Sequence, residues 1–391
     1  MIGTFLSGIP NTLASTAGRG FWMPEQASTV AESVDWVYMF ITWLCTFFFV
    51  LIVALMAVFM IKYRRRSHAA HPEGPVHHTA LEVTWTAIPL LLVVVIFYVG
   101  MKGYFDLQEE PEGAYEVYVT ASKWSWNFQH RNGAQDFVLD VPAGRDVKLI
   151  LGSQDVLHSL FIPAFRVKQD VVPGRYRSMW FNVPDDGSGS TRQYDLFCTE
   201  YCGTEHSSMT TVVNVVPEQQ WEAYIEEKAR IVDRLSDEQL PCYAAQRLYP
   251  RCASCHSLDG VAKTGPSFKG LWDRVQSGET VFTNGEVLSD LIGPGKPYAS
   301  GEDYIRQSIL KPQQHIVMNF AGAMPAFQGQ LQEKELLALI QFLKDPYAIV
   351  DEKGNLIVDC DLSAPAEGAA PASDDQTAGL DDETEKEGTT S

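Results

Sequence analysis

The sequence predicts a multidomain chain: a hairpin of two membrane-spanning helices, an all-β sandwich or barrel, a smaller folded unit and a disordered acidic tail. Three observations lead to this prediction. Two long apolar runs lie before residue 105, short alternating segments follow them, and acidic residues crowd the C-terminus. With 391 residues, the chain is long enough for two or three domains at the usual size of roughly 100 to 200 residues each.

The apolar runs extend from Trp36 to Ile61 and from Val83 to Met101. Each is close to the ~20 residues that a helix needs to cross the bilayer core. The first run holds 26 residues without a charged side chain, which is too long for a buried core helix. The sequence therefore predicts a membrane hairpin in a lipid bilayer.

Basic residues set the expected orientation of this hairpin. The loop between the runs holds Lys62, Arg64, Arg65 and Arg66, whereas the segment before the first run has only Arg19. The positive-inside rule places that loop in the cytoplasm. The hairpin is then expected to cross the inner membrane of a bacterial cell. Both termini and everything after the second run are expected in the periplasm. The first twenty residues lack a basic n-region, which leaves cleavage of a signal peptide open.

Short β-branched or alternating runs, separated by turn residues, follow the hairpin. This chemistry is typical of strands. The expected strands are 116–120, 137–141, 147–151, 179–183, 193–197 and 210–216. Their spacing favours a β-sandwich or barrel over a βαβ fold, and no long helix pattern interrupts them before Pro217.

A dense group of metal ligands lies between the last two of these strands. Cys198, Cys202, His206 and Met209 fall within twelve residues. Soft sulfur ligands with imidazole select copper, and the two cysteines could bridge two copper ions as a redox centre. A lone histidine such as His158 is usually a core residue, but this downstream group favours it as a further ligand. A disulfide or a thiol copper chaperone would explain the cysteines alone, although neither requires the histidine and methionine that follow.

A second chemical motif follows a helical connection expected at 218–239. Cys252-Ala-Ser-Cys255-His256 is the attachment pattern of c-type haem, with two thioether bonds and an axial imidazole. A structural zinc site would need two further ligands close by. The sequence therefore predicts covalent haem.

The second axial ligand of the iron is expected to be Met324, which precedes an amphipathic helix at 332–344. Paired with His256, it would give the higher-potential ligation of cytochromes c. Met318 and His315 are the alternatives. With both axial positions filled, oxygen cannot bind, so this unit is expected to relay electrons.

The remaining cysteines and the charge have simpler interpretations. Cys45 lies within the first apolar run, and Cys242 and Cys360 flank the last folded segment, where an oxidising compartment permits a disulfide. The net charge is −19, and residues 361–391 contribute nine acidic side chains against one lysine. Such a tail is expected to be disordered, serving solvation or steering of a basic electron carrier. No basic patch with interleaved aromatic residues points to nucleic acid.

These motifs carry a resemblance to subunit II of haem-copper cytochrome c oxidases, which extends over residues 30–217. The resemblance implies a cupredoxin-like Greek-key barrel and a binuclear copper site. By resemblance its ligands are His158, Cys198, Glu200 through its backbone carbonyl, Cys202, His206 and Met209. The Glu200 side chain would face a magnesium ion at the interface with subunit I. Quinol-oxidase relatives have lost these ligands, so the resemblance implies cytochrome c as the electron donor.

Two further segments fit the same family. Glu82-Val-Thr-Trp85-Thr86 resembles the signature that opens the second span, where the glutamate stands at the mouth of a proton channel in subunit I. A carboxylate at a helix start is otherwise a cap that interacts with the helix dipole. Trp124-Ser-Trp126-Asn-Phe128 resembles the aromatic patch below the copper site, and Trp124 would receive the electrons. Packing on one strand face is the competing interpretation of this patch.

Residues 240–347 resemble a class I cytochrome c, so the whole chain resembles the caa-type oxidases, in which this domain is fused to subunit II. The resemblance implies an oxidoreductase subunit that passes electrons from cytochrome c to haem a in subunit I, beside subunit III, for oxygen reduction coupled to proton pumping. A copper-containing nitric oxide reductase subunit and a periplasmic copper delivery protein are the alternatives. The expected units are an N-terminal periplasmic segment (1–30), the hairpin (31–105), the copper domain (106–217), a helical linker (218–239), an all-α cytochrome c domain (240–360) and the tail (361–391).

Overall fold

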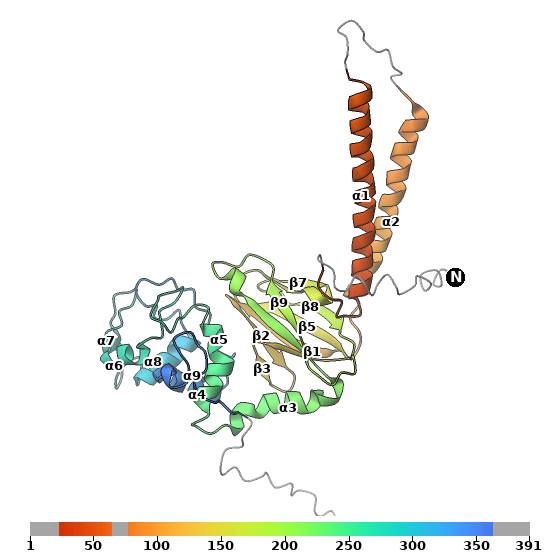
Figure 1. Ribbon diagram of the computed structural model, residues 1–391. Coiled ribbons are helices and arrows are strands. Elements are labelled where there is room, and N and C mark those ends of the chain that lie inside the picture. Colours follow the sequence, from red (N-terminus) through yellow and green to blue (C-terminus); the bar gives the residue numbers. More distant parts are fainter. Residues whose placement is uncertain (1–22, 65–76, 363–391) are drawn as a thin grey trace, which may run out of the picture.

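The computed structural model describes residues 23–64 and 77–362. It consists of a helical hairpin, a β-barrel and a helical C-terminal unit in series, with a linker helix crossing from the barrel to that unit (Figure 1). The expectations for Arg19, Arg65, Arg66 and most of the acidic tail lie outside the described residues. Below, the copper domain means residues 106–217 and the C-terminal unit means residues 240–360.

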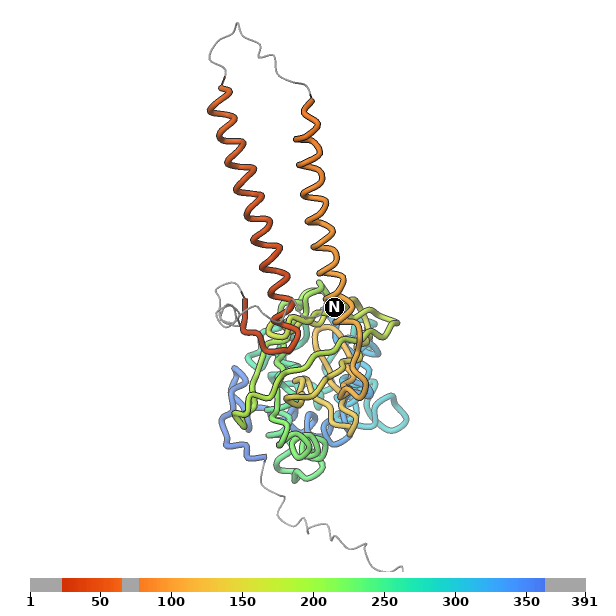
Figure 2. Tube along the Cα trace, turned by 90° about the vertical axis from the view of Figure 1, so that its right-hand side faces the viewer, coloured from red at the N-terminus to blue at the C-terminus, as the bar shows by residue number. Residues whose placement is uncertain are grey.

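The hairpin consists of α1 (Ala31–Lys62) and α2 (Thr79–Gln108). Both helices are long and apolar enough to cross a membrane, and no part of their most apolar windows is buried within the chain. They run side by side and project away from the rest of the molecule (Figure 2). Each helix is longer than its predicted apolar run: α1 begins five residues before Trp36, and α2 extends beyond its run at both ends.

A buried ion pair fixes the base of this hairpin to the copper domain. Asp35 lies near the start of α1 and is 3% exposed. Arg166 donates to both of its carboxylate oxygens, from Nε at 2.7 Å and from Nη2 at 2.9 Å. The same guanidinium also donates to the carbonyl oxygens of Pro24 and Pro163. The Arg166 guanidinium therefore links three segments of the chain where the hairpin meets the copper domain.

The copper domain contains two five-stranded sheets, ordered β3-β2-β1-β5-β8 and β4-β10-β9-β6-β7. The strands are β1 (Tyr115–Ser122), β2 (Ser125–His130), β3 (Gln135–Asp136), β4 (Leu139–Pro142), β5 (Asp146–Ser153), β6 (His158–Ile162), β7 (Val167–Val171), β8 (Arg177–Asn182), β9 (Arg192–Cys198) and β10 (Thr210–Val216). β1 pairs with β5 and β4 pairs with β10 in parallel, and the other pairings are antiparallel. The inward-facing side chains of both sheets form one apolar core.

All six predicted strands are present, although the one expected at 137–141 begins only at Leu139. The prediction missed β2, β3, β6 and β7. Two 3₁₀ turns, η2 (Pro163–Phe165) and η3 (His206–Ser208), interrupt the series. The domain is thus the β-sheet, cupredoxin-like unit that the sequence indicates.

The linker helix α3 (Glu218–Arg234) packs along one edge of the barrel. Its Trp221 is fully buried and meets the Tyr115 ring edge to face. Two turns further along the helix, Lys228 forms ion pairs with Asp136 and with the fully buried Asp140. A buried cation between two carboxylates therefore holds the helix on the copper domain.

The C-terminal unit is built from short helices around a second apolar core. Its elements are α4 (Leu240–Tyr243), the π-turn η4 (Ala244–Leu248), α5 (Tyr249–Cys252), α6 (Leu271–Ser277), α7 (Leu288–Leu291), α8 (Gly301–Leu310), α9 (Glu333–Lys344) and η5 (Pro346–Ala348). Gln332 caps α9 in a capping box with Glu335, so the predicted helix at 332–344 is one residue shorter. Cys242 and Cys360 form a disulfide, which confirms that pairing.

Replacement of Lys228 by Met should lower the free energy of unfolding by about 3–5 kcal/mol, because two carboxylates would stay buried without a cation. Urea titration of the detergent-solubilised chain, followed by intrinsic fluorescence, measures the change. Arg230→Met, at an exposed position of the same helix, is the control and should change stability by less than about 0.5 kcal/mol. Equal effects of the two variants would contradict a special role for the buried ion pairs.

Candidate metal centre

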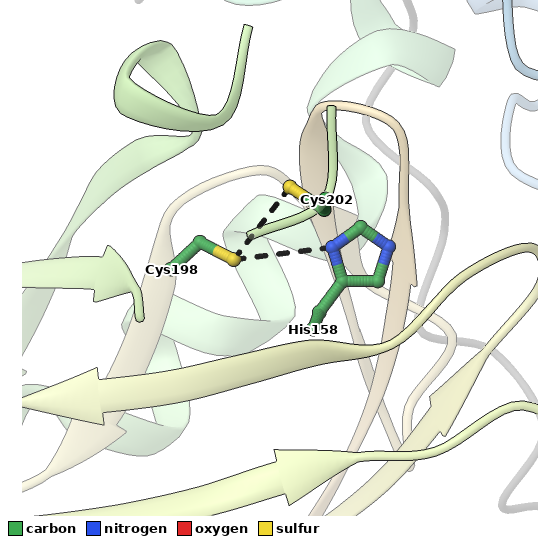
Figure 3. A group of neighbouring side chains, drawn as sticks. All are labelled: His158, Cys198 and Cys202. Carbon is green, nitrogen blue, oxygen red and sulfur yellow. Dashed lines mark hydrogen bonds between the residues drawn. The ribbon is translucent and has the colours of Figure 1, made fainter. Parts of the chain in front are cut away.

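Two neighbouring strands bring the first pair of expected copper ligands together. β6 begins at His158 and β9 ends at Cys198, and the two strands are hydrogen-bonded to each other. His158 Nδ1 lies 3.9 Å from Cys198 Sγ, and Cys198 Sγ lies 3.9 Å from Cys202 Sγ. Figure 3 shows both sulfur atoms on the side of the imidazole that carries Nδ1. The ligand atoms of these three buried residues lie within 4.8 Å of one another.

The loop after β9 adds the other expected ligands. His206 Nδ1 lies 3.4 Å and Met209 Sδ 3.8 Å from Cys202 Sγ. The backbone oxygen of Glu200 is 3.4 Å from Cys198 Sγ. The structure thus gathers all six residues expected from the sequence around one pair of sulfur atoms.

The two thiols affect each other's ionisation. Burial opposes ionisation of Cys198, but hydrogen bonds with His158 and the backbone outweigh burial and lower its pKa. Burial and the neighbouring Cys198 thiolate raise the pKa of Cys202. Because like charges this close repel in a buried site, both thiols ionise together only with a cation between them. Two buried sulfurs, two imidazoles and a thioether fit copper.

Asp155 orients the buried histidine. Its carboxylate lies 2.9 Å from His158 Nε2, which leaves Nδ1 facing the sulfurs. Burial lowers the pKa of His158, whereas the contacts with Asp155 and Cys198 raise it overall. Asp155 also accepts a 2.7 Å hydrogen bond from the backbone N–H of Lys123. A carboxylate behind a ligand histidine fixes its ring and raises its basicity.

Trp124 lies in the turn between β1 and β2, so the competing interpretation, that it packs on one strand face with Trp126, does not hold. Its indole N–H donates to the carbonyl oxygen of Cys202 at 3.2 Å. Gly203 allows this close approach: a Cβ there would lie 3.1 Å from the indole, and its φ of +123° disfavours other residues. Trp126, in contrast, is buried beside the His158 ring.

A cavity of about 460 Å³ lies in the C-terminal unit and is bordered by Trp124 of the copper domain; its volume is within the usual range of cofactor pockets. Cys252, Cys255 and His256 line it, as do Met318 and Met324. Burial raises the pKa of both thiols, so they are neutral at physiological pH. An apolar cavity with two thiols, an imidazole and thioethers fits a covalently attached haem.

The backbone around His256 is shaped for a ligand role. His256 Nδ1 lies 2.7 Å from the carbonyl oxygen of Pro266, which directs Nε2 away from that carbonyl. A Cβ on Gly265 would approach His256 Cε1 to 2.5 Å, so only glycine fits beneath the ring. Phe268 stacks on the imidazole with a centroid separation of 4.5 Å.

Of the three residues considered for the opposite axial position, His315 has both ring nitrogens engaged. Nδ1 contacts the Tyr298 hydroxyl, and Nε2 lies 3.2 Å from Glu286. Met318 and Met324 both line the cavity. Met324 packs against the apolar core, whereas Met318 is 42% exposed.

Glu82 and Glu200 have local roles in the structure. Glu82 Oε1 accepts a 3.1 Å hydrogen bond from the backbone N–H of His78, the residue that caps α2. It therefore caps the end of the hairpin remote from the copper domain (Figure 1). Glu200 contributes its carbonyl oxygen near the thiols, and its side chain is half-buried.

Sequence reasoning assigned no role to Asp155, Gly265 or Pro266. The three-residue spacing of Asp155 and His158 was the only signal for the first of these. The contact between Pro266 and His256 joins residues ten positions apart, and no local pattern indicates it. Contacts that hold a ligand histidine in place become visible only once the fold is known.

The barrel, the hairpin and the ligand cluster define a membrane-anchored, copper-binding electron-transfer subunit. Two family models match the chain: cytochrome c oxidase subunit II, transmembrane domain, over residues 16–102, and cytochrome c oxidase subunit II, periplasmic domain, over residues 94–216. Together they span residues 16–216, more than half of the chain. The chain belongs to the cytochrome c oxidase subunit II family and is an electron-input component of a haem-copper oxidoreductase that works with other oxidase subunits and cytochrome c.

Three known proteins are similar to this chain over part of its length. Cytochrome c oxidase subunit 2 of Alkalihalophilus pseudofirmus is 29% identical over 306 residues, covering 75% of this chain and 82% of the relative. Its counterpart in Cereibacter sphaeroides is 26% identical, covering 54% of this chain and 80% of its own. The crystal structure of the periplasmic domain of subunit II of cytochrome oxidase from Bradyrhizobium japonicum is 22% identical, covering 31% of this chain and 98% of its own with a TM-score of 0.29.

Replacement of Asp155 by Ala should weaken copper binding by about 10–100-fold, because His158 loses the carboxylate that orients it. Copper retained per chain after dialysis against graded chelator measures the effect. Asp195→Ala removes an exposed carboxylate from β9 and serves as the control. Equal copper retention in both variants would show that Asp155 is dispensable.

Proposed function

We propose that this chain relays electrons from cytochrome c through a covalent haem c and a binuclear copper centre to haem a in subunit I of a caa-type oxidase. In this proposal Cys252, Cys255, His256 and Met324 hold the haem, and the six residues around the sulfur pair hold the two coppers. The partner subunit reduces oxygen to water and couples this to proton pumping.

The observation that carries the proposal is the position of Trp124. Its ring lines the same cavity as Cys252, Cys255 and His256, although it belongs to the copper domain. Its indole N–H also donates to the carbonyl oxygen of Cys202. One side chain therefore contacts the metal loop and borders the haem cavity, which supports an electron path between them.

The chain's own residues prepare both sites for rapid transfer. Bound copper and haem supply one-electron redox couples. Burial of His158, Cys198, Cys202 and Met209 excludes water from the copper site. Asp155 and the carbonyl of Pro266 hold the two histidine rings in fixed orientations. Fixed ligands limit structural change when the oxidation state changes.

The extent of sequence similarity also supports a fused C-terminal domain. The family models end at residue 216, which is little more than half of the chain. The match to the Alkalihalophilus subunit covers 75% of the chain, so it extends well past that residue. Part of the C-terminal unit therefore aligns with a protein named as subunit 2, which supports the proposal of a fused domain.

We further propose that the copper domain and the C-terminal unit face the periplasm of a bacterial inner membrane. Lys62 and Arg64 at the far end of α1 favour a cytoplasmic loop. Glu82 then lies at the cytoplasmic side, where a proton channel of subunit I would open, and the Glu200 side chain would reach a magnesium ion at the subunit I interface. Subunit III completes the proposed complex.

Replacement of Cys198 by Ser should abolish the mixed-valence dicopper spectrum while haem remains attached, because a bridging thiolate is lost. Near-infrared absorption, electron paramagnetic resonance and a haem assay of the purified complex measure both parts. Cys45→Ser, which alters a thiol on α1, is the matched control. A dicopper signal that survives in the Cys198 variant would refute the bridging role.

Replacement of Met324 by Leu should lower the haem reduction potential by a sizeable part of the roughly 0.8 V range that axial ligands control. The thioether favours ferrous iron, so its loss favours the ferric form. Redox titration of the α-band absorbance gives the potential. Met318→Leu is the companion variant, and a fall in that variant alone would assign the ligand to Met318.

A further inference from the structure

The loops that carry the two metal-binding histidines touch each other directly. Thr264 Oγ1, from the C-terminal unit, donates a 3.1 Å hydrogen bond to Glu205 Oε1, from the copper domain. Glu205 immediately precedes the copper ligand His206. Thr264 lies two residues before Pro266, whose carbonyl oxygen holds His256. The contact therefore joins the immediate surroundings of both metal sites.

The copper-side loop holds the Glu205 carboxylate in place. Ser208 Oγ donates to Glu205 Oε2 at 3.2 Å, so each carboxylate oxygen has its own partner. The backbone N–H of Ser208 donates to the Glu205 carbonyl at 3.0 Å, and that of His206 donates to Gly203 at 3.1 Å. The carboxylate thus projects from a tight turn.

The loop of the C-terminal unit that carries Thr264 is also held by several hydrogen bonds. Gly265 N–H donates to the carbonyl oxygen of Cys255 at 2.9 Å, and Lys263 N–H donates to the carbonyl oxygen of Gly265 at 3.2 Å. The Lys263 ammonium donates to the carbonyl oxygen of Ala253 at 2.7 Å. Thr264 is therefore anchored to the Cys252–His256 segment on both sides.

We propose that Glu205 and Thr264 form a positioning pair that fixes the haem-site loop against the copper-site loop. The pair completes a continuous path of covalent and hydrogen bonds from His256 through Pro266, Thr264 and Glu205 to His206. This inference rests on the proposed relay function. One electron passes along the relay: the haem site is oxidised and the copper site reduced by one electron, with no bond made or broken and no proton moved.

Other contacts dock the two domains independently of this pair. Gln330 Nε2 donates to Gln154 Oε1 at 3.1 Å, and the Arg251 guanidinium contacts the Phe137 ring of the copper domain. Loss of the Glu205–Thr264 bond should therefore leave the domains docked and loosen only the two loops. This separates a positioning role from a general docking role.

The test uses Thr264→Val, which keeps the side-chain shape but removes the hydroxyl donor, in the full-length complex loaded with haem and copper. Intramolecular transfer after flash reduction of the haem should slow by about tenfold or more, because loss of a hydrogen bond to a charged group lowers the population of contacting loops by about that factor. Hydrogen–deuterium exchange of residues 203–209 and 263–268 should rise in the same variant. Thr264→Ser, which retains the donor, should restore both measurements.

Gln154→Ala is the control, because it removes a different hydrogen bond between the domains. It should leave the transfer rate and the exchange of both loops within twofold of the parent. Glu205→Ala combined with Thr264→Val should slow transfer no more than either change alone. Unchanged rate and exchange in Thr264→Val would overturn the positioning role, whereas absence of transfer in the parent would overturn the relay itself.

Discussion

Two buried thiols, with sulfur atoms 3.9 Å apart, impose the constraint on which the rest of the structure depends. When both thiols ionise, their negative charges repel unless cations lie between them. A soft cation such as copper needs further sulfur and imidazole donors around it, and the copper domain must supply them. Pairing of β6 with β9 supplies His158 and Cys198 from a rigid sheet. The loop that returns to β10 supplies the other donors within a few residues. His158 and Cys198 are held by paired strands, so their positions are rigid. The residues of the loop after β9 are the ones that could adjust to a metal.

The C-terminal unit meets the copper domain at the side where this loop emerges. Its Arg251 guanidinium contacts Phe137 and lies 4.9 Å from the centroid of Phe327, and its Nε and Nη2 atoms have no hydrogen-bond partner among the described residues. Burial lowers the pKa of this guanidinium. Stacking on aromatic faces compensates part of the desolvation cost. The interface therefore combines a cation packed on aromatic rings with hydrogen bonds such as that from Gln330 to Gln154.

The two metal-binding motifs could be predicted from the sequence because most of the residues in each motif are close together in the chain. The Cys198–Met209 segment and Cys252–His256 are local patterns, and two apolar runs suffice for the hairpin. β6 escaped prediction because its residues are buried on both faces, which removes the alternation that marks a strand. The contact between Glu205 and Thr264 could not be predicted because the two residues are 59 positions apart in the chain. Asp155 lies only three residues before His158, but that spacing alone does not show that the carboxylate reaches the ring. The position of Trp124 in a turn required the pairing register of β1 and β2.

The membrane anchor and the metal site are linked by a single short strand. β6 begins at His158 and, after one 3₁₀ turn, the chain reaches Arg166, which holds Asp35 of α1. At about 3.3 Å per residue, five residues of strand span roughly 17 Å. Because both ends of β6 are buried, the strand fixes the position of His158 relative to the base of the hairpin. The ion pair between Arg166 and Asp35 therefore sets how the expected ligand cluster is placed relative to the membrane anchor.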